Sequence, residues 1–128
     1  EEGEFLVLPG GGQNHGETLH QTVVREVNEE LGLSVVVEEL AYVREYVGKN
    51  HSMHRIHGHF HQVEAVFHCK CEDFGSIGAG KSQDRRQVGY LWIPLSKLDQ
   101  HPISPPGLSK IIMQNKKGGM GRYLGDVH

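Results

Sequence analysis

The sequence predicts an α/β fold, in which helices pack on a mixed β-sheet. Two observations carry this prediction: one stretch has apolar residues at every fourth position, and several later stretches are rich in β-branched residues. No internal repeat, linker or low-complexity segment divides the 128 residues. We therefore expect a single domain over residues 1–128.

An amphipathic helix is expected over residues 18–31. Thr18 and Gln21 match a capping box at its start, and Gly32 lies where a left-handed cap would end it. The apolar positions recur every fourth residue and so share one helical face. They are Leu19, Val23, Val27 and Leu31.

Strands and shorter helices are expected along the rest of the chain. The β-branched or aromatic runs that predict strands are residues 5–8, 35–37, 41–47, 60–71 and 90–93. Pro94 begins a short helical piece that ends at Leu98, and apolar spacing over residues 108–112 indicates a second helix. The glycine-rich tail gives no clear signal.

Composition narrows the class of protein. No apolar run approaches the roughly 20 residues that span a bilayer, and the acidic start is unlike a signal peptide, so a cytoplasmic protein is expected. With 13 basic and 16 acidic residues, the chain has no broad cationic face for extended nucleic acid. Cys69 and Cys71 lie on one side of a predicted strand and are expected to be reduced thiols.

A glycine-rich loop and an acidic helix suggest phosphate chemistry. The loop, residues 9–16, exposes backbone groups and leads to the positive end of the helix dipole. Glu26, Glu29 and Glu30 share one helical face and repel one another, a conflict that Mg²⁺ would relieve. On spacing alone, a solvated acidic face remains the simpler explanation.

The same residues resemble a known family motif. Gly11, Glu17 and the run Arg25 to Leu33 resemble the full Nudix box, with no fixed position departing from it. Residues 8–12 are similar to the family's entry loop, and residues 87–95 to the strand after its variable loop. The resemblance implies a Nudix-type α/β/α sandwich around a mixed β-sheet, with the box as a loop-helix-loop.

The resemblance also implies roles for individual residues. Water would attack a phosphorus of a diphosphate while a glutamate, which the sequence does not identify, accepts the proton. Arg25 would orient a carboxylate, although a simple ion pair with Glu29 is the alternative, and Glu17 would support the site. The expected cofactor is Mg²⁺, for which Mn²⁺ substitutes. Its implied ligands are Glu26, Glu29, Glu30, a carbonyl of Gly11 or Gly12, and Asp84, which is equally well explained as a turn residue.

The substrate is expected to be a nucleoside diphosphate linked to another group. No proline occurs between Gly10 and Ile93, so the downstream proline of the family's ADP-ribose hydrolases is missing, which favours nucleoside triphosphates or related nucleotides. His61, Tyr46, Phe60 and also Tyr42 are candidate substrate contacts, although strand aromatics more often lie in the core. The alternative is a non-catalytic nucleotide-sensing module, against which the intact carboxylates argue.

Two further patterns compete with this interpretation. Residues 75–82 satisfy the P-loop pattern literally, but a strand rather than a helix is expected after them. Histidines crowd residues 51–61, and His57, His59 and His61 alternate as on a strand, which suggests a polar face beside the substrate or a zinc or nickel site.

The start of the chain leaves one expectation about assembly. The family's fold includes one or two strands before the box, and here only residues 5–8 precede it. We expect either further N-terminal sequence or a sheet completed by another copy, as in a homodimer.

Overall fold

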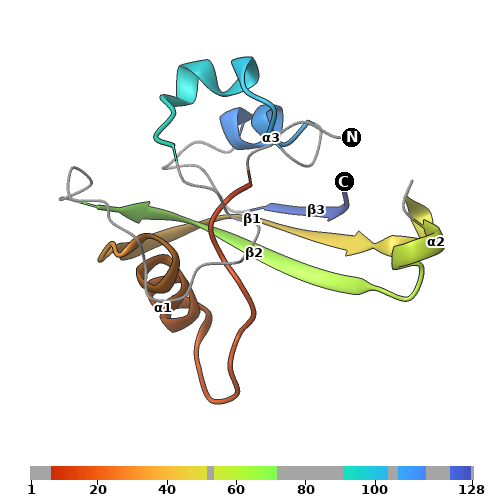
Figure 1. Cartoon of the computed structure of the whole chain (residues 1–128), viewed down its shortest axis with the longest axis horizontal. Coiled ribbons are helices and arrows are strands. Elements are labelled where there is room, and N and C mark those ends of the chain that lie inside the picture. The colour runs from red at the N-terminus through yellow and green to blue at the C-terminus, as the bar shows by residue number, and fades with distance from the viewer. Residues whose placement is uncertain (1–6, 52–53, 72–90, 104–106, 115–121, 128) are drawn as a thin grey trace. The chain divides into compact units, whose positions relative to one another are not determined.

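The structure is a computed structural model that describes residues 7–51, 54–71, 91–103, 107–114 and 122–127, with only the backbone of His54 and His57 (Figure 1). The helices are α1 (Leu19–Leu31), α2 (His54–His57) and α3 (Leu108–Gln114), and 3-10 turns span Gly48–Asn50 and Leu95–Gln100. The strands are β1 (Val36–Val47), β2 (His61–Lys70) and β3 (Arg122–Asp126). This confirms the predicted α/β class.

The three strands form one mixed sheet in the order β2-β1-β3. β3 runs parallel to β1, and β2 runs antiparallel to it in Figure 1. The register passes from Val43 opposite Tyr123 to Arg44 opposite Gly125, so Leu124 is an extra residue in β3. Gly125 takes the left-handed conformation at φ 77°, which suits such a bulge.

Several sequence predictions about strands are wrong. Residues 91–93 form no strand, and neither do residues 7–8, while the two runs predicted near residues 35–47 are one strand. A strand requires a hydrogen-bonded neighbour, which β-branched composition does not supply. His57 lies on α2 and His61 begins β2, so the alternation of His57, His59 and His61 is not that of one strand.

The described residues divide into two compact units, and both β1 and β2 run from one into the other. We call Leu8–Glu38 with Phe67–Ile93 the helix unit. The other is the sheet unit, made of Glu1–Val7, Glu39–Val66 and Pro94–His128. The single domain over residues 1–128 stays a prediction.

A small core in the sheet unit joins α3 to the sheet. Ala41, Tyr42 and Leu108 are buried together, and α3 also packs against the 3-10 turn that carries buried Leu98. The side chains around them are Val66, Ile103, Ile111, Ile112 and Leu124. Tyr42 is 1% exposed, so it is a core residue rather than a contact for a nucleobase.

Fewer hydrophobic side chains are buried among the described residues of the helix unit. Val27 and Leu33 are buried, but Leu19 is 46% exposed, so the apolar face of α1 is only partly covered. The ring of His20 meets Phe67 edge-on at 5.0 Å, which attaches α1 to β2. None of the described helices is long and apolar enough to cross a bilayer.

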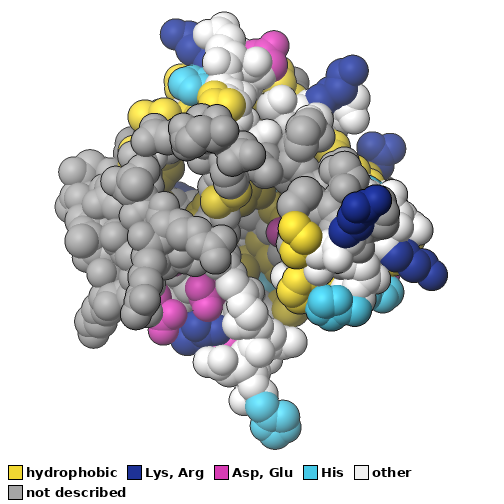
Figure 2. All heavy atoms as spheres, turned by 45° about the vertical axis from the view of Figure 1, so that its right-hand side comes forward, with side chains coloured by type: hydrophobic (Ala, Val, Ile, Leu, Met, Phe, Trp, Pro, Cys, Tyr) yellow, Lys and Arg dark blue, Asp and Glu magenta, His cyan; other side chains and the backbone are white. Residues whose placement is uncertain are grey.

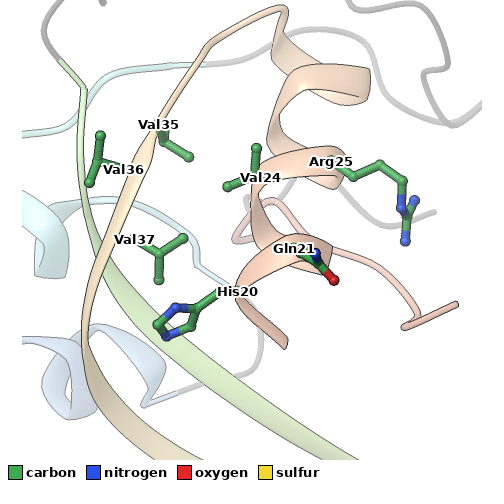
Figure 3. Close-up of a pocket in the computed structure, with 7 residues that line it drawn as sticks. All are labelled: His20, Gln21, Val24, Arg25, Val35, Val36 and Val37. Carbon is green, nitrogen blue, oxygen red and sulfur yellow. The ribbon is translucent and has the colours of Figure 1, made fainter. Parts of the chain in front are cut away.

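An open pocket of about 500 Å³ lies beside α1 in this unit (Figure 3). Val24 and His20 face the valines of residues 35–37 across it, whereas the Arg25 side chain points away from those valines. The residues that line it are His20, Gln21, Val24, Arg25, Val35, Val36 and Val37. Arg25 therefore borders this pocket, but its guanidinium points away from the valines.

Candidate metal and catalytic site

Local hydrogen bonds set the position at which α1 begins. The Thr18 hydroxyl accepts from the Gln21 amide at 3.1 Å, and the Gln21 side chain accepts from the Thr18 amide at 2.8 Å, so the predicted capping box is confirmed. At the other end, Gly32 is left-handed at φ 71° and donates to the Asn28 carbonyl, as predicted. Residues at or next to each end determine where α1 begins and ends, so both ends could be predicted from the sequence.

The Arg25 guanidinium is the centre of the charged face. It donates through Nε to Glu17 Oε2 at 2.7 Å and through Nη2 to Glu17 Oε1 at 3.1 Å. Nη1 donates to Glu26 Oε1 at 2.8 Å and to Glu29 Oε1 at 3.2 Å, and Nη2 also donates to the Gly12 carbonyl at 2.8 Å. A guanidinium has five N–H donors, so every one is engaged. We call these residues the Arg25 cluster: Gly12, Glu17, Arg25, Glu26 and Glu29.

Glu17 is held more firmly than the other carboxylates of the Arg25 cluster. Besides Arg25, it accepts from the Asn14 amide at 2.9 Å and from the Thr22 hydroxyl at 2.9 Å. The hydrogen bond from Arg25 is the main reason that its pKa is lowered to about 2, and the bond from Asn14 adds to it. The hydrogen bonds from Arg25 to Glu17 and then to Glu26 raise the pKa of Arg25, so Arg25 and Glu17 are both charged at neutral pH.

The three predicted metal ligands have different surroundings. Glu26 and Glu29 converge on Arg25, with side chains 15% and 37% exposed, whereas Glu30 accepts from the Gly10 amide at 3.2 Å and so joins the helix to the loop. Acidic side chains in contact with a basic one are visible at the surface in Figure 2 (magenta beside dark blue).

Without rearrangement, this face does not present a metal-binding group. Within the described residues, no three histidine, cysteine or carboxylate side chains are arranged to hold an ion. Arg25 already stands between Glu26 and Glu29, and its single positive charge offsets part of their negative charge. The donors nevertheless suit a hard divalent cation, because two carboxylate oxygens and a carbonyl oxygen converge on one positive charge.

Gly11 lies in close contact with a side chain of α1. A Cβ atom placed there would collide with the Glu26 carboxylate. The absence of a side chain at Gly11 therefore lets the Glu26 carboxylate lie directly against the loop.

The candidate substrate residues have partners of their own in the sheet unit. His61 Nε2 lies 2.7 Å from Glu45 Oε1, and the Tyr46 ring stacks on His51 at 5.2 Å. Phe60 is 52% exposed and stacks on His59 at 5.1 Å. Their roles in binding substrate stay predictions.

Sequence reasoning missed a second polar cluster, which forms where β3 meets β1. Glu45 accepts from the Tyr123 hydroxyl as well as contacting His61. Asp126 accepts from the Val47 amide and Asn50 side chain, both at 2.9 Å, and lies 2.6 Å from His51. The strand-end cluster comprises Glu45, Asn50, His51, His61, Tyr123 and Asp126. No sequence signal could have found it, because β3 itself was not predicted.

The pKa values of both carboxylates in the strand-end cluster are lowered. The hydrogen bond from Tyr123 is the main cause at Glu45, followed by His61. At Asp126 the contact with His51 is the main cause, and its pKa falls to about 2. Among the described histidine side chains of residues 51–61, His51 and His61 each contact a carboxylate and His59 stacks on Phe60. The polar face beside the substrate and the zinc or nickel site both stay predictions.

Several predicted features lie outside the described residues. They are Asp84, the possible additional metal ligand, the P-loop-like run at residues 75–82, and the parts of the predicted strands that fall on residues 5–6 and 87–90.

The chain is an α/β protein in which a glycine-rich loop leads into a capped helix, α1. This helix carries carboxylates on one face, and Glu30 joins it to the loop. The family model for the NUDIX domain matches residues 2–114, and the chain therefore belongs to the Nudix family. Hydrolases of this family generally use divalent metal ions and act on nucleotide derivatives. No curated protein matches the chain closely enough to narrow the activity further.

Proposed function

We propose that this protein hydrolyses a diphosphate linkage in a nucleoside diphosphate that carries another group, with Mg²⁺ as the bound ion and Mn²⁺ as a substitute. The observation that supports this most is the convergence of Glu26, Glu29 and the Gly12 carbonyl on one positive charge. A helix face selected only for stability has no need to bring these oxygens together against their repulsion.

The proposed ligands are oxygen atoms of the helix and the loop. Glu26, Glu29 and Glu30 would supply carboxylates, with the carbonyl of Gly11 or Gly12 and the side chain of Asp84 completing the set. The bound ion would neutralise charge on the phosphate oxygens. Glu17 is a positioning residue in this proposal, because it fixes the guanidinium beside the ligands rather than facing them.

A glutamate of the helix accepts the proton of the attacking water in this scheme. Glu29 suits that role, since its side chain is 37% exposed and its contact with Arg25, at 3.2 Å, is the longest in the Arg25 cluster. Glu26 is more restricted, because it lies against Gly11 as well as Arg25.

The proposed substrate is a nucleoside triphosphate or a related nucleotide rather than ADP-ribose. This rests on the absence of a proline between Gly10 and Ile93. His61, Tyr46 and Phe60 are proposed to contact the base or sugar, and the exposed Phe60 ring offers a stacking surface.

A screen of nucleotide substrates with Mg²⁺ and with Mn²⁺ tests the proposal, with products separated by chromatography. Metal-dependent release of a nucleoside monophosphate with pyrophosphate, or of the two halves of a diphosphate, is the expected result. Tight binding of a nucleotide without turnover under either metal would instead establish the sensing module.

A further inference from the structure

We propose that Glu45 fixes the rings of His61 and Tyr123 as an exposed stacking surface for the base of the nucleotide, and that this surface selects bases with an exocyclic amino group. We call these three residues the Glu45 platform. The inference rests on the proposed function for the class of ligand, a nucleotide. It adds Glu45 and Tyr123 to the residues that recognise it.

The Glu45 platform takes one residue from each strand of the described sheet. His61 begins β2, Glu45 lies on β1 and Tyr123 lies on β3, and these strands are neighbours in that order (Figure 1). One oxygen of Glu45 lies 2.7 Å from His61 Nε2, and the other accepts from the Tyr123 hydroxyl. Both rings are therefore fixed to the same carboxylate on the middle strand.

The two rings are nevertheless open to solvent. The His61 side chain is 57% exposed and Tyr123 is 67% exposed, whereas the Glu45 side chain between them is 22% exposed. Ordering an exposed side chain costs conformational entropy, and an exposed contact with a carboxylate returns little stability. Binding gives a better reason to fix such rings, because a ligand that meets a preorganised surface loses less free energy to ordering.

The polar atoms that remain on the Glu45 platform are acceptors. Hydrogen bonds from Tyr123 and then from His61 lower the pKa of Glu45, so its carboxylate is ionised at neutral pH and can only accept. His61 must then donate through Nε2, which leaves Nδ1 of the neutral ring as an acceptor. The Tyr123 oxygen donates its hydrogen to Glu45 and can also accept. Neither acceptor has a further partner among the residues that the structure describes.

These features suit a planar base that donates from its edge. Tyrosine and histidine rings are surfaces on which nucleobases stack. Acceptors beside such rings favour bases that carry a donor, and the amino groups of adenine, guanine and cytosine are donors. Thymine presents a carbonyl oxygen in place of such a group, so its edge cannot satisfy the same acceptors.

Titration with nucleoside monophosphates tests the Glu45 platform without turnover, since a monophosphate has no diphosphate linkage to cleave. The ring signals of His61 and Tyr123 are followed by nuclear magnetic resonance at about pH 8, where imidazole is neutral. We expect the monophosphate of adenosine, guanosine or cytidine to shift both signals. Each is compared with the same nucleotide without its amino group, the monophosphates of purine riboside, inosine and 2-pyrimidinone riboside. The base that binds best should bind about fivefold more tightly than its counterpart, the effect of one hydrogen bond.

Two variants separate stacking from selection, with circular dichroism to show that they are folded. Tyr123→Leu removes a ring and should weaken binding of both nucleotides of the pair by about tenfold. His61→Phe keeps a ring but removes the acceptor, so it should retain stacking and bind the two with nearly equal affinity. Gln62→Ala is the matched control, because Gln62 is an exposed neighbour of His61 whose side chain points to the other face of β2. It should change neither the affinity nor the preference.

The comparison within the unaltered protein decides the inference even if Tyr123→Leu does not fold. Equal affinities for every nucleotide and its counterpart, or no shift of either ring signal with any of the three, would overturn it. A preference that persists in His61→Phe would place the acceptor elsewhere and would also overturn it. Metal-dependent hydrolysis without these binding effects would leave the proposed function standing alone, and the binding effects without hydrolysis would do the reverse.

Discussion

The two polar clusters of this protein combine carboxylates and hydrogen-bond donors in opposite arrangements. In the Arg25 cluster a single cation is surrounded by carboxylates, and every member lies between residues 12 and 29. In the strand-end cluster each carboxylate is surrounded by donors, and Glu45 and Asp126 meet residues from distant parts of the chain. Carboxylates gathered around one cation suit the proposed metal site, whereas carboxylates that each accept from several donors suit a structural role.

The largest expected effect of this difference is on turnover. Glu29→Gln and Glu30→Gln should each lower metal-dependent hydrolysis by a factor on the order of 10²–10⁴, because each removes a charge from the proposed metal site. Initial rates with the substrate found in the screen provide the measurement. Asp126→Asn makes the equivalent change in the strand-end cluster and should leave the rate close to that of the unaltered protein. Equal rates in the Glu29 and Glu30 variants and the unaltered protein would disprove the proposed site.

A smaller loss of activity is expected when the space beside Gly11 that the Glu26 carboxylate occupies is filled. Gly11→Ala puts a methyl group where the Glu26 carboxylate lies, so that carboxylate must move. Gly11 is not among the glycines at positive φ, and the fold should tolerate alanine. We expect kcat/KM to fall by roughly tenfold to 10²-fold, with little change in melting temperature. His15→Ala, in the same loop at an exposed position, is the control and should keep the full rate.

Acid should weaken both clusters in the same pH window. Glu17 and Asp126 both have folded pKa values of about 2, below their ordinary values of 4.5 and 3.8. A carboxylate whose pKa is lowered by folding stabilises the protein at pH values above its ordinary pKa. This stabilisation is lost as the pH falls toward the pKa of the folded protein. Stability to urea should therefore decline from about pH 4.5 to about pH 2.

Two variants assign this decline to its sources. Glu17→Gln and Asp126→Asn should each flatten the pH dependence of the urea midpoint. The slope should fall by the equivalent of up to about one proton taken up on unfolding, because one titrating carboxylate is removed. Each should also be less stable than the unaltered protein at neutral pH, where the lost carboxylate was ionised and paired. A variant that keeps the full slope would show that its carboxylate has no lowered pKa in the folded protein.

The sequence predicted the helix region well because its interactions are local. Thr18, Gln21 and Gly32 define the ends of α1 through contacts within a few residues, and the helix begins one residue after the cap, as capping chemistry requires. The pairing of Arg25 with Glu29 also follows from their separation by four residues. The spacing could not predict that all five N–H donors of Arg25 are engaged. The contact with the Gly12 carbonyl depends on how the loop folds back against the helix.

The sheet unit was predicted less well because its contacts are long-range. β3 pairs with a strand about 80 residues earlier, and its bulge at Leu124 and Gly125 removes any simple alternation. The helix unit also holds one wrong strand prediction, since residues 91–93 have strand-like composition and form no strand. For the candidate site, the residues of the box came from family resemblance, whereas the turn of Glu30 toward Gly10 came only from the structure.

The smallest expected effect concerns a polar group on β1 that belongs to neither cluster. The Tyr42 hydroxyl is buried and has no hydrogen-bond partner within the described part of the chain. Burial, with some contribution from Glu64, raises its pKa to about 12. A buried donor without a partner destabilises the folded state, because it loses its hydrogen bonds to water.

Tyr42→Phe should therefore stabilise the protein by up to about 1 kcal/mol, since it removes the hydroxyl and keeps the ring in the core. The urea midpoint should rise with no change in the slope of the transition. Tyr123→Phe is the matched control, because its hydroxyl donates to Glu45, and that variant should lose stability instead. Opposite signs for the same chemical change would show that partners, rather than the hydroxyl itself, decide what a polar group contributes to this sheet.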